Sequence, residues 1–493
     1  MAWPVRLVPA GGGPLFQRIA RAVIDDIRRG RLVADQRLPG SRALAAELGV
    51  HRNTVLAALA ELEAQGWIVT RPARGTFVAP TLPEVRPAVR PASGRDRWAA
   101  GAGDRPGFAL PAWQPPGPPP AAGVARGHLL LSAGVPDPRL FPVDALARAW
   151  RRVVRRDGRR LLTYEAPEGH PALRAALAAM LRAIRGMAVA ADDLLITRGS
   201  QMALDLVARG LLAPGERVAV EALGYRPAWD ALRLAGAELV PIAVDGGGLD
   251  VAALARVAAR RTVRAVYLTS HHQYPTTVTL GASRRLALLE LARRHRWIVI
   301  EDDYDHEFHY EGRPVAPLAA ADDGGNVVYV GTLSKILAPG LRLGFLAAAP
   351  PVVARLAALR AAMDRQGDRP MEAAVAELIE DGELERHVRR MRTTYLARRD
   401  ALVHHLRARL AGELTFDVPR GGISVWAQVA PGLDVDAWLA ASAAHGVHVS
   451  PGRRYTFTGD DPRALRLVFA PLTPAELDRA TAVLAATRPR RRR

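Results

Sequence analysis

The chain has 493 residues, of which 49% are apolar, and it contains no cysteine. Because one hydrophobic core rarely organises so long a chain, we expect two or more globular domains. The lack of cysteine excludes disulfides, thiol catalysis and cysteine zinc sites, and no apolar run approaches the length of a membrane span. The N-terminus does not resemble a signal peptide, so we expect a cytoplasmic protein with neither a metal site nor a membrane partner.

The formal net charge of +19 favours an anionic partner such as nucleic acid. Nearly all basic residues are arginine, and the richness in alanine, glycine and proline is equally typical of a GC-biased genome. Charge alone therefore leaves both explanations open. The basic end of the chain, 488–493, is expected to be a solvated tail.

Lysine occurs once in the chain, at position 335. Arginine serves wherever a plain positive charge is needed, but its guanidinium stays protonated and cannot attack a carbonyl as a neutral amine would. The single Lys335 therefore indicates Schiff-base chemistry.

Residues 14–78 have the pattern of a small helix-turn-helix domain. Apolar residues at helical spacing predict a first helix over 15–27. Ser41 is expected to cap a second helix over 42–48, and a third helix follows from Arg52 to about Gln65. Two short helices joined by a tight turn that contains glycine are typical of DNA-binding domains.

Two strands are predicted beyond the third helix, at 67–70 and 75–78, with a basic hairpin tip, or wing, at 71–74. The next segment is rich in proline and poor in large apolar residues, so it cannot fold alone. We therefore expect a DNA-binding domain over 1–78, a linker over 79–127 and a larger domain over 128–493.

Four segments of the first domain carry a family pattern: LPGSRALA at 38–45, LGVHRNTV at 48–55, LEAQG at 62–66 and RGTFV at 74–78. They resemble the GntR family of winged-helix DNA-binding proteins. The resemblance implies that the third predicted helix is the recognition helix. Its first residues, Arg52, Asn53 and Thr54, would reach base edges and phosphates of double-stranded operator DNA.

The same resemblance implies that Arg42, Arg71 and Arg74 mostly contact phosphates. His51 departs from the family pattern, in which a small serine usually caps the recognition helix. A helical module that binds protein instead of DNA is the alternative reading of this domain.

Apolar strands alternate with helical patterns in the larger domain, with strands at 194–197, 217–220, 265–268 and 297–300. Such alternation implies a mostly parallel sheet flanked by helices, which binds ligands at the carboxyl ends of its strands. The last of these strands leads directly into the acidic segment 301–305, where a site would lie.

Four side chains of this domain suit pyridoxal phosphate. Lys335 offers an amine for the aldehyde, and Asp302 offers a carboxylate that keeps the pyridine nitrogen protonated. Tyr304 offers a hydroxyl for the ring oxygen, and Arg342 a positive charge for the phosphate. An aspartate after a strand is more often a turn residue or a helix cap, but the four residues together indicate a cofactor site.

Further segments carry a second resemblance: 132–137, 140–142, 164–174, 201–206, 272–276, 301–305 and 387–392. They resemble the fold-type-I aminotransferases. Taken with the first domain, they resemble the MocR subgroup of GntR regulators, which fuses both halves. The resemblance implies a multidomain protein with an all-α, winged-helix domain and an α/β domain of the pyridoxal-phosphate-dependent aminotransferase fold, the latter also serving as effector-binding and dimerisation domain.

The resemblance also implies roles for individual residues. Lys335 would form the imine with the cofactor and is the one residue expected to be catalytic. Asp302 would contact the pyridine nitrogen and Tyr304 the ring hydroxyl, with Tyr225 stacked on the ring.

The phosphate would lie among Gly199, Ser200, Thr332 and Arg342, because backbone amides at a helix N-terminus bind anions. In the implied homodimer, Tyr164 would reach the phosphate of the partner subunit.

Arg466 would pair with the carboxylate of a ligand. Three positions depart from the family pattern: Leu223, Thr277, which stands where glycine usually follows Pro-Thr, and Arg198, which replaces a small residue beside the phosphate loop. These departures concern ligand specificity and transaminase activity more than cofactor binding.

The sequence therefore predicts a DNA-binding transcription regulator that senses pyridoxal phosphate, an amino compound, or both, through the Schiff base of Lys335. A working aminotransferase with an accessory DNA-binding domain is the main alternative. If the protein is a regulator, we expect at most a residual aminotransferase half-reaction. A DNA-architectural protein with an inactive cofactor fold is the third possibility. The effector, the operator and the sign of regulation cannot be deduced from these residues.

Overall fold

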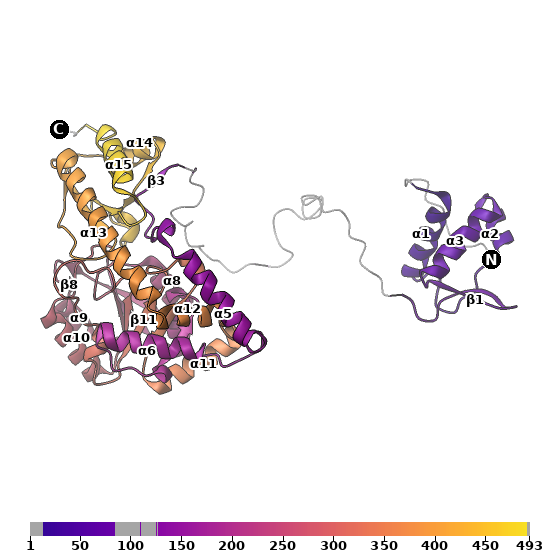
Figure 1. Cartoon of the computed structure of the whole chain (residues 1–493), viewed down its shortest axis with the longest axis horizontal. Coiled ribbons are helices and arrows are strands. Elements are labelled where there is room, and N and C mark those ends of the chain that lie inside the picture. The colour runs from indigo at the N-terminus through magenta and orange to yellow at the C-terminus, as the bar shows by residue number, and fades with distance from the viewer. Residues whose placement is uncertain (1–12, 84–108, 110–124, 126, 491–493) are drawn as a thin grey trace. The chain divides into compact units, whose positions relative to one another are not determined.

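A computed structural model describes residues 13–83, 109, 125 and 127–490 (Figure 1). The described residues up to 109 belong to one compact unit and those from 125 onward to another. Most of the expected linker, 79–127, and the end of the tail, 491–493, lie outside the described residues. Among the described helices, none is both long and apolar enough to cross a membrane.

The first unit is a helix-turn-helix followed by a two-stranded hairpin, as predicted. The strands pair antiparallel, from Ile68 opposite Val78 to Arg71 opposite Gly75. The elements are α1 (Leu15–Arg28), α2 (Ser41–Leu48), α3 (Arg52–Ala64), β1 (Ile68–Arg71) and β2 (Gly75–Val78).

The core of this unit follows the helical spacing of the sequence. Ile19, Val23 and Ile27 lie one turn apart on α1 and are all buried against Leu62 of α3 and Trp67. Burial of one apolar face in each helix stabilises such a short domain, because its isolated helices would be marginal.

The helix caps differ from the prediction. Ser41 does not cap α2, because it is the first helical residue and Gly40 precedes it as the N-cap. The Ser41 hydroxyl instead accepts a hydrogen bond from Arg52 Nε at 3.3 Å. His51 does cap α3, because its Nδ1 accepts the backbone N–H of Asn53 at 3.3 Å. An imidazole nitrogen therefore satisfies one of the free amides that a serine oxygen usually satisfies.

The second unit is built on a seven-stranded sheet in which only one strand is antiparallel to its neighbours, so the predicted mostly parallel sheet is confirmed. The order across the sheet is β4 (Leu194–Thr197), β12 (Gly344–Ala347), β11 (Val327–Thr332), β10 (Ile298–Asp303), β9 (Ala265–Leu268), β5 (Arg217–Glu221) and β6 (Glu238–Ile242). The antiparallel strand is β12. Strand β10 extends three residues beyond the predicted end at 300, because Asp302 and Asp303 continue its pairing with β11.

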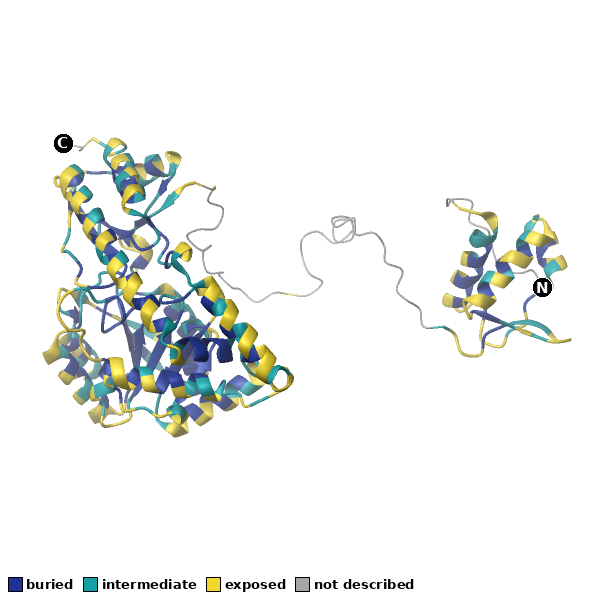
Figure 2. Cartoon of the chain, in the orientation of Figure 1, coloured by how far each residue is buried: buried dark blue, intermediate teal, exposed yellow. Residues whose placement is uncertain are grey.

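Helices cover both faces of the sheet (Figure 1), and its strands are mostly buried, except for the edge strand β6 (Figure 2). Val218 and Val220 pack on one side against α7 (Ser200–Leu211), α8 (Arg226–Leu234) and α11 (Pro350–Met363). Ala219 points the other way, toward α9 (Val251–Ala258) and α10 (Ala282–His295). The alternation of side chains along a strand explains why all three residues are apolar.

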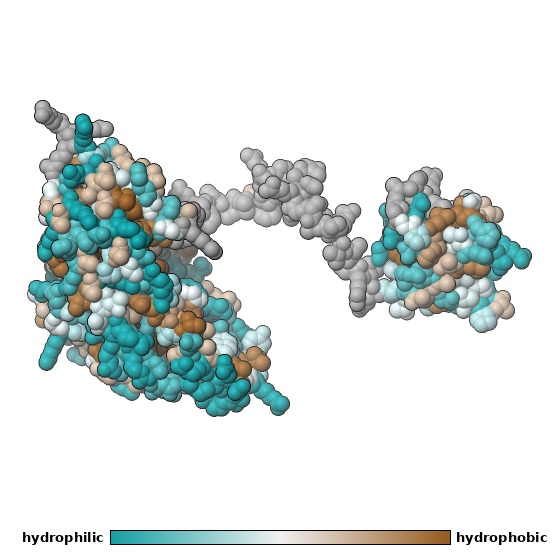
Figure 3. Space-filling view, turned by 45° about the horizontal axis from the view of Figure 1, so that its top comes forward, coloured by the Kyte–Doolittle hydropathy of each residue, from teal (hydrophilic) through white to brown (hydrophobic). Residues whose placement is uncertain are grey.

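The remaining long helices are α5 (Val143–Leu161), α6 (Pro171–Arg185), α12 (Arg369–Glu380) and α13 (Glu383–Leu410). Of these, α6, α12 and α13 share a core with Ile196 of β4 and Phe345 of β12, at the β4 end of the sheet. The outer face of the unit is mostly hydrophilic, with scattered hydrophobic residues (Figure 3).

A smaller subdomain has a four-stranded sheet of β13 (Leu414–Thr415), β14 (Ser424–Val429), β17 (Ala464–Val468) and β16 (Ser450–Pro451). Helices α14 (Val435–Ala444) and α15 (Pro474–Ala486) belong to it. The short strand β3 (Leu129–Leu130), at the start of the unit, pairs in parallel with β15 (Val447–His448) of this subdomain. A further hairpin joins β7 (Val244–Asp245) to β8 (Gly248–Leu249).

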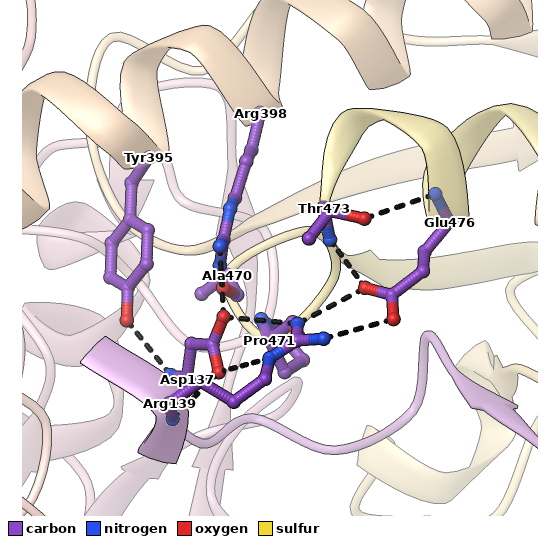
Figure 4. A network of polar contacts seen from close by, with 8 residues as sticks. All are labelled: Asp137, Arg139, Tyr395, Arg398, Ala470, Pro471, Thr473 and Glu476. Atoms are coloured by element: carbon purple, nitrogen blue, oxygen red, sulfur yellow. Dashed lines mark hydrogen bonds and ion pairs between the residues drawn. The ribbon is translucent and has the colours of Figure 1, made fainter. Parts of the chain in front are cut away.

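A polar network fixes the segment after β3 to α13 and α15 (Figure 4). The Asp137 backbone N–H donates to the Tyr395 hydroxyl at 3.0 Å, and Arg398 Nη2 donates to Asp137 Oδ2 at 2.8 Å. Arg139 then bridges Asp137, at 2.9 Å, to both carboxylate oxygens of Glu476, at 3.0 Å. Charge-assisted bonds of this kind are strong, so they hold the chain in place next to the site described below.

Candidate functional site

A cavity of about 200 Å³ lies where the parallel strands β5, β9, β10 and β11 end. Seven of the residues predicted for the cofactor line it: Ser200, Tyr225, Asp302, Tyr304, Thr332, Lys335 and Arg342. Residues far apart in the chain are thus brought together at the edge where an α/β sheet binds ligands. The other lining residues, which the sequence analysis did not assign, are Gln201, Thr269, Tyr274, Ser334 and Pro339.

Asp302 is buried near the carboxyl end of β10 and has one free oxygen. Its Oδ2 accepts a hydrogen bond from the Tyr267 hydroxyl at 2.9 Å, whereas its buried Oδ1 has no partner. Burial raises the pKa of the Asp302 carboxyl to about 7. A cationic N–H group placed at Oδ1 would satisfy this oxygen and favour its ionised form.

Lys335 lies just beyond β11, and its Nζ donates to the backbone oxygen of Gly134. Burial lowers the pKa of the Lys335 amine to about 8, with Arg466 as a second cause. The amine is therefore much easier to deprotonate than an exposed lysine, as a nucleophilic amine must be. The polar network around Asp137 fixes the segment that carries Gly134.

The opposite end of the cavity is suited to an anion. Gly199, at φ 77°, turns the chain from β4 into α7, whose first residue is Ser200. Arg342 Nη2 donates to the backbone oxygen of Arg198 at 2.8 Å, and a Cβ added to Gly199 would lie only 3.2 Å from that Nη2. A helix N-terminus and a guanidinium therefore converge at a place that only glycine leaves open.

Three tyrosines form an aromatic wall. Tyr274 meets Tyr225 edge-on at 5.3 Å between centroids and Tyr304 at 5.9 Å. Burial raises the pKa of Tyr225 to about 12 and that of Tyr304 well above 10, so both phenols are neutral hydrogen-bond donors. Tyr274 belongs to a segment that carried the family resemblance, so the sequence held a signal for it.

Arg466 lies on β17 with its guanidinium 4.7 Å from the Tyr274 ring centroid. It is 2% exposed, and the neighbouring tyrosines keep its pKa above the usual value despite burial. Arg466 does not line the cavity and lies behind the aromatic wall. It is next to Gly134, because a Cβ added to Gly134 would lie 3.1 Å from Arg466 Nη1. Arg453, a nearby alternative in sequence, is instead paired with Asp436 at the surface.

Tyr164 is not part of the cavity of its own chain. It is 78% exposed, and the guanidinium of Arg365 lies 5.0 Å from its ring centroid.

The residues expected to bind DNA lie on the first unit, and all except Thr54 and Arg71 are exposed. Arg42, Arg52, Asn53 and Arg74 are exposed, and Thr54 is half-buried on the first turn of α3. In contrast, Arg71 is half-buried, lies 4.7 Å from the Phe77 ring centroid and is paired with Asp35 at 2.5 Å. Arg71 therefore has a structural partner in addition to any phosphate.

The departures from the family pattern have local explanations. Thr277 adopts φ 64°, a left-handed conformation that favours the glycine usual at this position. The Arg198 side chain pairs with Asp364 at 2.9 Å and is not among the residues that line the cavity. Leu223 also lies outside the cavity and forms an isolated bridge with Thr456.

Tyr267 is the residue near the site that sequence reasoning missed most completely. It lies within the buried strand β9, in a run that reads only as a strand. Nothing in the local pattern indicates that its hydroxyl meets Asp302, because that contact joins residues 35 positions apart.

Each unit matches a known family. Residues 15–78 match the bacterial regulatory proteins of the gntR family, and residues 127–484 match aminotransferase class I and II.

Two regulators match nearly the whole chain, and a solved aminotransferase matches about three quarters of it. The chain is 33% identical to the probable rhizopine catabolism regulatory protein MocR of Rhizobium meliloti, over 94% of this chain and 91% of that protein. It is 35% identical to the HTH-type transcriptional regulator TauR of Rhodobacter capsulatus, over 98% of this chain and 99% of that protein. LysN, the α-aminoadipate aminotransferase of Thermus thermophilus solved with N-(5'-phosphopyridoxyl)-L-leucine, is 30% identical, with a TM-score of 0.68 over 73% of this chain and 92% of that one. The chain therefore belongs to the MocR subgroup of the GntR family of transcription regulators, in which a winged helix is joined to an aminotransferase-like domain.

Proposed function

We propose that this regulator binds pyridoxal phosphate on Lys335 and uses the state of that site to change its affinity for operator DNA. The observation that carries the proposal is the pairing, in one cavity, of the only lysine with a buried aspartate that has a free oxygen. The aldehyde of the cofactor supplies reversible covalent capture of amines.

The residues fit this cofactor in chemistry. Asp302 Oδ1 offers an acceptor for the pyridine N–H, and the Tyr304 phenol offers a donor for the ring hydroxyl. The amides around Gly199 and the Arg342 guanidinium suit the phosphate, together with the hydroxyls of Ser200 and Thr332. Tyr225 supplies a flat apolar surface for the ring.

The effector we propose is an amino compound with a carboxylate. Arg466 is a buried cation on the far side of the aromatic wall from the phosphate end. A carboxylate that reached it would satisfy its charge bidentately. LysN, whose structure carries a phosphopyridoxyl derivative of leucine, supports a ligand of this class.

A homodimer is part of the proposal. Tyr164 is exposed and lies outside its own cavity, as a residue that serves the partner's site would. In addition, Val143, Ala147, Trp150 and Val154 line an apolar groove at helical spacing on α5, with Val143 63% exposed. A stripe of this kind is typical of a helix that packs against another copy.

The first unit would bind the operator through α3 and the wing, with Arg52 and Asn53 closest to base edges and Arg42 and Arg74 at phosphates. Such binding places the protein in the cytoplasm, where it meets DNA. We assign residues 1–78 to DNA binding, 79–127 to the linker and 128–493 to cofactor binding and dimerisation.

The test compares regulation with catalysis on one preparation of the full chain. Operator affinity and keto-acid release are measured without cofactor, with pyridoxal phosphate, and with each of a panel of amino acids. We expect operator affinity to change at least fivefold with the state of the site, as typical coupling energies allow, while turnover stays slow. Rapid multiple turnover without any effect on DNA binding would instead favour the accessory-domain aminotransferase. Borohydride reduction and peptide mapping should place the cofactor on Lys335.

A further inference from the structure

Four histidines cluster beside the cofactor cavity, and the proposed function uses none of them. His271 and His272 follow β9, and His306 and His309 follow β10, so two loops from adjacent parallel strands contribute two residues each. The ring centroid of His271 lies 4.2 Å from that of His272, 4.4 Å from that of His306 and 5.8 Å from that of His309. His271, His272 and His306 are each 2% exposed.

The ring nitrogens of this cluster are largely unsatisfied. Both nitrogens of His271, Nε2 of His272 and Nδ1 of His309 are buried without a hydrogen-bond partner. A neutral imidazole carries one donor and one acceptor, and leaving both buried without partners is costly. Something that accepts lone pairs from several imidazoles at once would remove this cost.

We propose that His271, His272 and His309 bind a divalent transition-metal ion of the zinc class. One nitrogen from each ring lies within 4.8 Å of the others. Ligand nitrogens around a tetrahedral zinc, at about 2.0–2.1 Å from the ion, stand about 3.4 Å apart. Small ring rotations would therefore bring the three nitrogens to one ion. The sequence predicted no metal site, so the proposed site reverses that prediction.

The surroundings favour a cation and orient one ligand. His272 Nδ1 lies 2.8 Å from Asp305 Oδ1, which fixes the ring so that Nε2 is the free nitrogen. Carboxylate–histidine pairs of this kind are the usual outer partners of zinc ligands. Asp303 Oδ2 lies 3.0 Å from His306 Nδ1, but its charge is shared with Arg185, whose Nη1 lies 3.7 Å from the same oxygen.

The test uses the untagged full chain, stripped of metal and then titrated with Zn²⁺ and, for spectroscopy, Co²⁺. We expect one equivalent of Zn²⁺ per chain, intense visible bands of four-coordinate Co²⁺, and three imidazole ligands in the zinc X-ray absorption spectrum. A saturating ion should also raise the melting temperature, because it binds the folded state. Substoichiometric binding, or two imidazoles or fewer, would overturn the proposal without the use of any variant.

Variants separate this site from a competing one. His309→Ala and His271→Ala should each weaken Zn²⁺ binding at least tenfold. The matched control is His448→Ala, because His448 Nε2 lies 2.9 Å from His128 Nδ1 in a separate histidine pair. Loss of binding in His448→Ala, or unchanged binding in both cluster variants, would show that the ion is held elsewhere. The result does not depend on pyridoxal phosphate, so its failure leaves the proposed function intact.

Discussion

Tyr267 on β9 donates a hydrogen bond of 2.9 Å to Oδ2 of Asp302 on the neighbouring strand β10. One position further along β10, Asp303 Oδ2 accepts a similar bond of 2.7 Å from Tyr329 on β11. Successive residues of a strand point to opposite faces, so the two pairs have the same chemistry but different surroundings. Only Asp302 lines the cofactor cavity.

Tyr267→Phe should weaken the binding of pyridoxal phosphate about tenfold. Loss of the phenol raises the Asp302 pKa further above its value of about 7, so less of the carboxylate is ionised to meet the pyridine N–H. A hydrogen bond to a charged group contributes roughly 1.5–3 kcal/mol, which is enough for this effect. Spectroscopic titration of the apoprotein at pH 7.5 measures it.

Tyr329→Phe is the control for that experiment, because it removes the same kind of buried bond from Asp303. It should lower stability at least as much, because the Tyr329 hydroxyl also accepts a hydrogen bond from Arg185, and it should leave cofactor affinity unchanged. Equal losses of affinity in both variants would mean that the Tyr267 effect is a general loss of packing.

Cofactor capture should accelerate with pH only up to about 8. The Lys335 pKa is lowered to about 8, so the neutral, nucleophilic amine grows about tenfold per pH unit below that value and saturates above it. Stopped-flow rates are measured from pH 6 to 10.5 and divided by those of an α-blocked lysine, which cancels the ionisations of the cofactor itself. The ratio should therefore be highest at low pH and fall above pH 8. A flat ratio would mean that Lys335 titrates like an exposed lysine.

Thr277→Gly should stabilise the second unit. A left-handed conformation costs a residue with a side chain roughly 1–2 kcal/mol, and the greater freedom of unfolded glycine offsets about 0.5–1 kcal/mol of the gain. We expect the free energy of unfolding to rise by about 0.5–1 kcal/mol in denaturant titrations. Thr276→Gly is the matched control at a position without positive φ, and it should destabilise. A loss of stability in Thr277→Gly would show that the Thr277 hydroxyl, which donates to Thr276 at 2.6 Å, matters more than the backbone.

Arg52→Ala should reduce operator affinity at least tenfold and leave cofactor uptake unchanged. Arg52 is exposed on the first turn of α3, where recognition helices reach bases and phosphates. Arg21→Ala removes the same charge from an exposed position on α1 and serves as control. Affinities measured at several salt concentrations should give a smaller salt dependence for Arg52→Ala than for Arg21→Ala. Equal effects would mean that only net charge matters.

Much of the architecture could be predicted because apolar periodicity survives in the local sequence. The spacing of Ile19, Val23 and Ile27 predicts α1, and the short apolar runs predict the strands of the central sheet. The end of β10 was placed too early, since acidic residues normally signal the end of a strand, whereas Asp302 and Asp303 are buried within it by their tyrosine partners.

The sequence alone identified the cofactor residues, from their types and from the single lysine. It did not reveal the contacts between distant segments. The histidine cluster is the clearest case. His271 and His309 are 38 positions apart, neither lies at a spacing typical of metal ligands, and only the parallel pairing of β9 with β10 brings their loops together. Ser41 was misassigned for a simpler reason: Gly40 and Ser41 are both good N-cap residues, and composition does not choose between them.

The pairing of β3 with β15 determines where the tether from the DNA-binding unit is anchored. Residues 129 and 130 are part of the smaller subdomain, and the Asp137–Arg139 network clamps the following turn to α15 of that same subdomain. Arg466, on β17, belongs to it too. The first strand after the linker and the arginine behind the aromatic wall therefore belong to the same subdomain.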